Sequence, residues 1–537
     1  MTTDATVGSL TGGQALAKSL VREGVTTIFG LPGDQIMHAL DGLYGERDEL
    51  RFITTRHEQG TTYMADGYAR AGGRPGVALV VPGVGVYNAA AGLATAWATS
   101  SPVLLIAGQV PRDGIGKDLG LLHDVHDQLE LVRPITKWAQ RVLEATAVPA
   151  AVREAFRQMQ VGRPRPVEIE IPPEALAETA DIQLLDPVPP ERSAGDPERL
   201  KRAAEWLAAA ERPLLYAGGG VVQGDASAAF TALAEKLSAA CVTSREGKGA
   251  ISDANPLAVG TAWVNRRLHP LIQDADVILA VGTRFQNTGA LPSQRVIHID
   301  VDPEETGRHF SGAYGIEADA RLALQFLLAE LDGIASRASR VSELRAARAS
   351  VEEELRKVGP QAALVEMLRD ALPDETILSA GTTTVGYMAH MLFRVYEPRT
   401  YLSSSYMGTL GFAFPTALGA KVARPDRPVV TVIGDGGFLF AGTELATAVQ
   451  HDIATVTVVF NDGAFGNSNR DQRERFGGRE IGTQLRNPDF AAFARSFGAD
   501  GIRIDAAEQL GDAVREALAG ERPAVIECPM DRLPSPF

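Results

Sequence analysis

Short apolar runs and longer stretches with helical spacing alternate along the chain. In the N-terminal third, runs rich in β-branched residues predict buried strands, and stretches with a 3.6-residue period predict the helices between them. The predicted strands are 27–30, 51–55, 77–81, 103–107 and 167–171, and the predicted helices are 11–23, 59–70 and 88–99. This alternation is typical of a parallel sheet covered by helices on both faces. We therefore expect a first α/β domain over residues 1–175.

The same alternation returns twice further along the chain. A central domain is expected over residues 190–340 and a third over residues 358–537. Their predicted strands are 213–216, 277–281, 296–299, 376–379, 429–433 and 454–460, and their predicted helices are 198–210, 226–239 and 443–451. The first and third domains share a strand–helix order without a visible sequence repeat, which raises the possibility of a duplicated fold. The predicted fold class is α/β, with three doubly wound parallel-sheet domains.

Two segments are interpreted as connections between these domains. Residues 172–197 contain six prolines (172, 173, 187, 189, 190 and 197) and little periodicity, which is typical of a linker. Residues 332–357 are charged and largely helical in pattern, which indicates a surface connection.

Composition narrows the class of protein. A length of 537 residues suits about three domains of roughly 150 residues each. A net charge of −15 argues against nucleic acid or an anionic membrane as the main partner. Two cysteines argue against a disulfide framework and against a thiolate metal site. The chain has neither a signal-peptide pattern at its start nor an apolar stretch of about 20 residues, so we expect a cytoplasmic enzyme.

A glycine-rich turn and an asparagine end two neighbouring predicted strands of the third domain. Asp435 follows strand 429–433, and Asn461 follows strand 454–460. Because parallel strands end at the same edge of a sheet, both side chains should face one crevice. Glycines let the backbone approach a bulky anion, and a helix N-terminus can receive it. An all-oxygen ligand set here would suit Mg²⁺. The alternative is an ordinary βαβ turn whose aspartate caps a helix.

The spacing of this motif resembles a known family. Gly434-Asp435-Gly436, then 24 residues (437 to 460), then Asn461 resembles the diphosphate-and-metal motif of thiamine-diphosphate enzymes. The resemblance implies that the metal ligands are Asp435, Asn461 and the carbonyl of Gly463. It also implies that the cofactor contacts Gly434, Asp435, Gly436, Gly437, Asn461, Gly463, Ala464 and Phe465. Asp462 stands where many relatives have a second asparagine, at a position that is not a ligand.

Glu58 is the key residue of the first domain. Taken alone, it is a carboxylate at a helix N-terminus, which the helix dipole stabilises. However, residues 56–70, RHEQGTTYMADGYAR, closely resemble the segment with the activating glutamate in acetolactate synthases and related decarboxylases. By that resemblance, Glu58 is catalytic and binds the cofactor. Its carboxyl group hydrogen-bonds N1′ of the aminopyrimidine and favours the imino tautomer, which removes the proton from C2.

Other segments follow the same family. The stretch that ends at Gln109 resembles one that ends at a catalytic glutamine, and Gly33, with Asp34 and Gln35, matches a loop near the reactive carbon. Lys137 matches a family lysine. The resemblance implies that Gly408 offers a carbonyl to the aminopyrimidine and that Leu410 bends the cofactor, with core packing as the alternative for Leu410. Backbone amides and hydroxyls at the end of strand 376–379 could hydrogen-bond diphosphate, through Gly381, Thr382 and Thr383.

Two segments depart from acetolactate synthases. His123 and His126 stand where the family usually has Phe-Gln. They could be metal ligands, but no third ligand is apparent, so a substrate-facing loop with an acid–base role is the interpretation, and solvated histidines are the alternative. Residues 466–486 carry five arginines and three acids. They form either a solvated surface or a lid that meets the substrate carboxylate, and Asp471 replaces the acceptor-selecting tryptophan.

The sequence therefore predicts a thiamine-diphosphate- and Mg²⁺-dependent enzyme of the acetolactate synthase/pyruvate oxidase type. The expected reaction is decarboxylation of a 2-oxo acid, after which the enamine is passed to an acceptor. The alternatives are decarboxylation without ligation and, more remotely, a non-enzymatic nucleotide-binding regulatory protein.

The resemblance also bears on other partners of the chain. In the family the central domain often holds FAD in a structural role, and here Gly218-Gly219-Gly220 is a weak signal without the full dinucleotide fingerprint. An empty structural domain is the alternative. In the family the cofactor spans a subunit interface, which implies a homo-oligomer in which a dimer is obligatory, with a tetramer expected. We expect no nucleic-acid or membrane partner.

Overall fold

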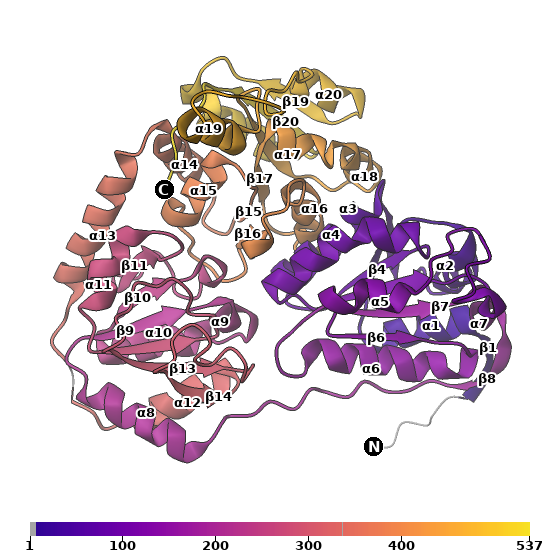
Figure 1. Cartoon of the computed structure of the whole chain (residues 1–537), viewed down its shortest axis with the longest axis horizontal. Helices are drawn as coiled ribbons and strands as arrows, with labels where there is room; N and C mark the ends of the chain where they lie inside the picture. Colours follow the sequence, from indigo (N-terminus) through magenta and orange to yellow (C-terminus); the bar gives the residue numbers. More distant parts are fainter. Residues whose placement is uncertain (1–6, 336) are drawn as a thin grey trace. The chain divides into compact units, whose positions relative to one another are not determined.

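The computed structural model describes residues 7–335 and 337–537 (Figure 1). The chain divides into two compact units. Unit 1 contains the chain up to Glu191 together with Tyr406–Pro425 and Ala441–Ala454. Unit 2 contains Arg192–Ser405, Asp426–Phe440 and Thr455–Phe537. The helices among the described residues are too short or too polar to span a lipid bilayer.

Unit 1 is built on a six-stranded parallel sheet with the order β3-β2-β4-β5-β7-β6. Its strands are β2 (Thr27–Gly30), β3 (Arg51–Thr54), β4 (Gly76–Val80), β5 (Val103–Gly108), β6 (Trp138–Arg141) and β7 (Val167–Ile171). Helices α1 (Gly12–Arg22) and α6 (Val148–Gln160) bury their apolar sides in one core with these strands. Helix α3 (Glu58–Gly72) packs against α4 (Val84–Thr99). The predicted sheet is present, with β6 as an additional strand.

The segment predicted to be a linker is partly ordered secondary structure. Helix α7 (Pro173–Ala177) and strand β8 (Thr179–Gln183) both lie within it, and β8 pairs antiparallel with β1 (Val7–Thr11). The linker prediction was therefore wrong for its first half. The paired residues are 168 to 176 positions apart, so the pairing leaves no local pattern. Pro172 and Pro173 lie at the start of α7, and the other four prolines follow β8.

Unit 2 contains two more six-stranded parallel sheets. The central sheet has the order β11-β10-β9-β12-β13-β14 and the third has the order β16-β15-β17-β18-β20-β19. The central strands are β9 (Pro213–Ala217), β10 (Ala240–Thr243), β11 (Ala258–Thr261), β12 (Val277–Val281), β13 (Arg295–Asp300) and β14 (Tyr314–Glu317). The third set is β15 (Ile377–Ala380), β16 (Tyr401–Ser403), β17 (Val429–Gly434), β18 (Val456–Asn461), β19 (Asp500–Arg503) and β20 (Ala524–Pro529). The three parallel sheets confirm the predicted fold class.

The first and third sheets have the same topology. When each set of six strands is numbered in chain order, both sheets read 2-1-3-4-6-5 from edge to edge, whereas the central sheet reads 3-2-1-4-5-6. The shared order supports the idea of a duplicated fold. The central order is typical of dinucleotide-binding sheets.

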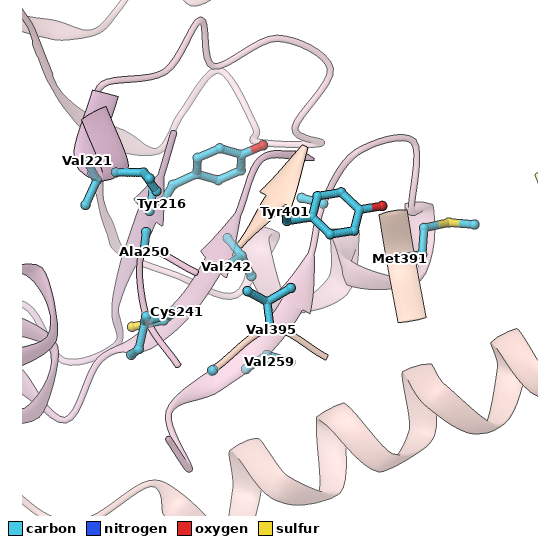
Figure 2. Packing of buried hydrophobic residues seen from close by; sticks show 14 of the residues in the cluster. Tyr216, Val221, Cys241, Val242, Ala250, Val259, Met391, Val395 and Tyr401 are labelled. Carbon is cyan, nitrogen blue, oxygen red and sulfur yellow. The ribbon is translucent and has the colours of Figure 1, made fainter. Parts of the chain in front are cut away.

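The central and third sheets of unit 2 share one hydrophobic core. Figure 2 shows Cys241, Val242 and Val259 of the central sheet in the same cluster as Val395 and Tyr401. Helix α13 (Val341–Arg356), in the predicted surface connection, buries Leu344, Val351 and Leu355 despite its charged sequence.

Candidate active site

Three loops that the sequence singled out leave adjacent strands of the third sheet. Strand β17 lies between β15 and β18, and all three are parallel. Their carboxyl ends therefore bring together Gly381–Thr383, Gly434–Gly437 and Asn461–Phe465. The chain order reverses between β15 and β17, which is the position where ligands bind in open α/β sheets.

The predicted metal ligands meet at this edge. Asp435 is 2% exposed and begins the short helix α17 (Asp435–Leu439). Asn487 donates from Nδ2 to Oδ2 of Asp435 at 2.5 Å and to Oδ1 of Asn461 at 2.9 Å. Oδ1 of Asn461 also accepts from the N–H of Gly463 at 3.3 Å. The structure thus gathers Asp435, Asn461 and Gly463 into one cluster and adds Asn487, which sequence reasoning missed.

The environment of this cluster fits a cation. Burial raises the pKa of Asp435, and burial together with Asp435 raises the pKa of Asp462 to about 6. Oδ2 of Asp435 and Oδ1 of Asn461 both accept from Nδ2 of Asn487, so the two oxygens point to one place. Oxygens of this kind are the ligands that Mg²⁺ prefers. Gly463 has φ +66°, and its carbonyl accepts from the N–H of Leu485 at 2.8 Å, which leaves its second lone pair for another partner.

The glycines and threonines beside this cluster suit a bulky anion. A Cβ on Gly434 would lie 3.3 Å from Thr383 Oγ1, so the first two loops are close together. A Cβ on Gly436 would lie 2.6 Å from the ring of Phe465, which explains why glycine stands there. Thr383 is the N-cap of α15 (Thr384–Leu392), so the first N–H groups of that helix are directed toward the loops.

Glu58 begins helix α3 in unit 1 and is 6% exposed. Asn88, from α4, donates from Nδ2 to Oε2 of Glu58 at 3.0 Å. His57 is the N-cap, and its ring Nδ1 accepts from the N–H of Gln59 at 3.1 Å. The carboxyl group is therefore buried and held by a neighbouring helix.

Glu444 is a second buried acid beside this helix, and no sequence motif pointed to it. Its carboxylate accepts from the backbone N–H groups of Arg56 and His57. Burial raises the pKa of Glu444. Glu444 belongs to the part of the metal-motif segment that folds with unit 1.

Gln109 is buried in unit 1 within a network of polar groups. Oε1 of Gln109 accepts from the N–H of Val110 at 2.7 Å. Burial raises the pKa of Glu170, and a hydrogen bond with the side chain of Gln109 opposes part of that rise. Gln128 links Glu170 to the loop after β4, since it donates to Oε2 of Glu170 at 2.8 Å and accepts from the N–H of Gly83 at 2.8 Å. Glu170 and Gln128 were missed because neither belongs to a recognised motif.

The structure separates the two predicted histidines. Nδ1 of His123 lies 3.2 Å from Oε1 of Gln35, in the loop that also contains Gly33. His123 has φ +65°, and its carbonyl lies against Gly83. His126 is exposed and pairs with Asp118 at 2.9 Å. The two histidines therefore have different surroundings, and among the described residues no cluster of three or more His, Cys, Asp or Glu could hold a metal.

Three other predicted residues can also be placed. Gly408 is exposed with φ +61°, and Leu410 is half-buried in unit 1. Lys137 donates to the carbonyls of Val161 and Arg163, just after α6, which gives it a structural explanation.

Among the five arginines of residues 466–486, Arg470 is the buried one. It lies on α19 (Gly466–Arg475) and donates to Oδ1 of Asn467. Asp471 pairs with Arg475 at 3.5 Å.

The glycine triplet of the central domain has a packing explanation. The N–H of Gly220 donates to the carbonyl of Gly282 at 3.0 Å, and a Cβ on Gly218 would lie 2.0 Å from that carbonyl oxygen. The turns after β9 and β12 therefore touch at the position where the strand order reverses. This close contact accounts for the glycines without a bound nucleotide.

Family comparisons agree with the fold, and the matched ranges include both motif segments. The family described as "Thiamine pyrophosphate enzyme, N-terminal TPP binding domain" matches residues 10–131, its central domain matches residues 200–327, and its C-terminal TPP binding domain matches residues 379–528. The chain belongs to the thiamine-diphosphate-dependent enzymes, and it is of the acetolactate synthase type.

Its relatives carry different activities in their names. A probable 2-ketoarginine decarboxylase from Pseudomonas aeruginosa is 36% identical over 95% of this chain and 92% of its own. A probable acetolactate synthase large subunit from Methanocaldococcus jannaschii is 34% identical over 97% of this chain and 92% of its own. A sulfoacetaldehyde acetyltransferase from Castellaniella defragrans is 30% identical over 95% of this chain and 91% of its own.

Proposed function

We propose that the protein uses thiamine diphosphate and Mg²⁺ to decarboxylate a 2-oxo acid and transfer the remaining fragment to an acceptor. The observation that carries the proposal is the buried carboxyl group of Glu58, which Asn88 holds at the start of α3. A protein that only bound nucleotides would have no use for this group.

The residues of the chain divide the work. Asp435, Asn461 and Gly463 would hold the metal, and Gly381–Thr383 with Gly434–Gly437 would receive the diphosphate. When bound, thiamine diphosphate supplies a nucleophilic carbon and accepts the electrons released as CO₂ departs. Glu58 exchanges a proton with N1′ of the pyrimidine, and buried groups around Gln109 keep bulk water away.

A second candidate is decarboxylation in which the remaining fragment is simply protonated and released as an aldehyde. Asp471 favours it, because acetolactate synthases have an acceptor-selecting tryptophan there. The name of the 2-ketoarginine decarboxylase relative also suits it.

Product analysis separates the two candidates. The enzyme with thiamine diphosphate and Mg²⁺ would be incubated with a panel of 2-oxo acids that includes pyruvate and 2-ketoarginine, with CO₂ release as the first readout. Acetolactate from pyruvate supports transfer to an acceptor, and an aldehyde in amounts equal to CO₂ supports protonation. Absence of CO₂ release across the panel would contradict both.

A further inference from the structure

Glu444 has the contacts of a residue with a specific task. It ends the 3₁₀ turn η8 (Gly442–Glu444), directly before α18 (Leu445–Gln450), and is 1% exposed. Its Oε1 accepts from the N–H of Arg56 at 3.1 Å and from the N–H of His57 at 3.0 Å. A buried carboxylate is costly unless such donors satisfy it, so these contacts must be maintained for Glu444 to stay there.

The two N–H groups belong to the residues immediately before Glu58. Because α3 begins at Glu58, holding the backbone of Arg56 and His57 fixes the direction in which the chain enters the helix. Asn88 holds the side chain of Glu58 from α4. The catalytic carboxyl group is thus fixed at its backbone by Glu444 and at its oxygen by Asn88.

Gly60 shows that the approach of Glu444 is close. A Cβ at Gly60 would lie 2.4 Å from Oε1 of Glu444, so only glycine leaves room for the carboxylate. Glycine is unfavourable inside a helix, and this contact explains its presence in the first turn of α3.

The rest of the segment is attached to the same strand and turn. Ring Nε2 of His451 accepts from the N–H of Thr54 at 3.0 Å, and Thr447 donates from Oγ1 to the carbonyl of Thr54 at 3.2 Å. Thr447 Oγ1 also bonds to Oε2 of Glu444 at 2.6 Å. Glu444 therefore acts from a segment that is itself docked against β3, within unit 1.

We propose that Glu444 is a positioning residue for Glu58, which it holds in place through the backbone N–H groups of Arg56 and His57. The expected effect on catalysis rests on the proposed function, whereas the contact between Glu444 and the two N–H groups is present in the protein without a ligand. Since a displacement of about 1 Å can cost about 10²-fold in rate, removing the contact should slow proton exchange at C2 of bound thiamine diphosphate by about that factor.

The first test uses the protein without cofactor. Hydrogen–deuterium exchange would be measured on a peptide that contains Arg56 and His57 in wild type, Glu444→Ala and Glu444→Gln. Loss of both acceptor oxygens in Glu444→Ala should speed exchange of the two amides by at least about 10-fold. Glu444→Gln keeps one oxygen that can accept from both N–H groups and should remain near wild type.

The matched control is Leu20→Ala, a fully buried position of α1 in the core of unit 1. It lowers stability through a cavity without touching the turn before Glu58, so amide exchange at Arg56 and His57 should not change. If Glu444→Ala does not fold, Glu444→Asp can replace it, because the shorter side chain keeps the carboxylate but moves it away from the two N–H groups. It should show an intermediate loss of protection.

The second test measures deuterium exchange at C2 of thiamine diphosphate, together with cofactor affinity. Glu444→Ala should slow C2 exchange about 10²-fold while it changes the dissociation constant of the cofactor by less than about 3-fold. Leu20→Ala should leave both unchanged at a temperature below its unfolding transition.

Three results would overturn the proposal: unchanged amide exchange in Glu444→Ala, lost protection with normal C2 exchange, or a loss of cofactor affinity as large as that in Asp435→Ala. If the wild-type protein does not accelerate C2 exchange at all, the proposed function fails. Unchanged amide exchange in Glu444→Ala, with the proposed function intact, would count against Glu444 alone.

Discussion

At the scale of single residues, Glu58 and Asp435 stand in different hydrogen-bonding environments. Asn88 donates one hydrogen bond to Glu58, whereas Asp435 accepts from Asn487 and lies close to backbone N–H groups that lower its pKa against the effect of burial. Under the proposed function, Glu58 would act on the pyrimidine of the cofactor, whereas Asp435 would be a carboxylate ligand of the metal.

Motifs in the sequence pointed to Glu58, Asp435 and Asn461, because their local spacing is distinctive. Asn487 and Glu444 could not be found in the same way. Asn487 reaches Asp435 from 52 positions away, and Glu444 reaches Arg56 from 388 positions away. Such contacts depend on tertiary packing, and residues so far apart leave no recognisable pattern in the sequence.

Replacing Glu58 with glutamine should keep the cofactor bound but slow its activation. Glutamine preserves the shape and can still bond to Asn88, but it cannot exchange a proton with N1′. We expect C2 proton exchange, followed by NMR, to slow by about 10²- to 10⁴-fold. Wild-type exchange rates in Glu58→Gln would remove Glu58 from the mechanism.

Replacing Asp435 with alanine should weaken the binding of Mg²⁺ and thiamine diphosphate together. Asp435 would hold the metal, and the metal would contribute to binding of the diphosphate, so the loss of this anionic ligand should weaken both. Titration of metal-stripped Asp435→Ala with the cofactor, with and without Mg²⁺, measures the effect. An affinity equal to that of wild type in the presence of Mg²⁺ would refute the assignment.

At the scale of elements, the long apolar strands were predictable, and most of the strands that were missed lie at sheet edges. The edge strand β3 was nevertheless predicted, and the inner strands β10 and β20 were missed. Strands β12 and β17 are continuous apolar runs, which is typical of the interior of parallel sheets. Strands β14 and β6 lie at sheet edges and are short and partly polar, so their sequences do not differ from those of loops. Strand β8 was obscured by the prolines around it.

Helix α3 depends on small residues for its packing against α16 (Ala413–Ala423), within unit 1. A Cβ on Gly67 would lie 1.9 Å from the carbonyl oxygen of Thr416. Gly67→Ala should therefore destabilise unit 1 by about 1–3 kcal/mol, seen as a lower midpoint of thermal unfolding.

Gly45→Ala is the matched control for Gly67→Ala. Gly45 is the last residue of α2 (Met37–Gly45), and a Cβ there would have no neighbour within 4 Å. Alanine at this position should leave the free energy of unfolding unchanged or raise it by up to about 1 kcal/mol, so the midpoint should stay the same or rise. Equal effects of the two substitutions would contradict the packing explanation.

At the scale of the whole molecule, the shared 2-1-3-4-6-5 topology of the first and third sheets was only suggested by the order of predicted elements. The sequence pattern could not reveal that Tyr406–Pro425, before the metal motif, and Ala441–Ala454, inside it, fold with the unit that carries Glu58. These two segments belong to unit 1 although the residues next to them in the sequence belong to unit 2, because packing depends on the shape of the helices and not on their position along the chain.

The central claim is that Glu58 and Asp435 act on one thiamine diphosphate, and by resemblance to the family they do so from different chains of a dimer. Glu58→Ala and Asp435→Ala, each inactive alone, would be mixed, dissociated and reassembled. With random pairing, about half of the dimers are mixed, and each has one intact site, so activity should recover to roughly a quarter of wild type. A mixture that contains heterodimers but stays inactive would contradict the claim.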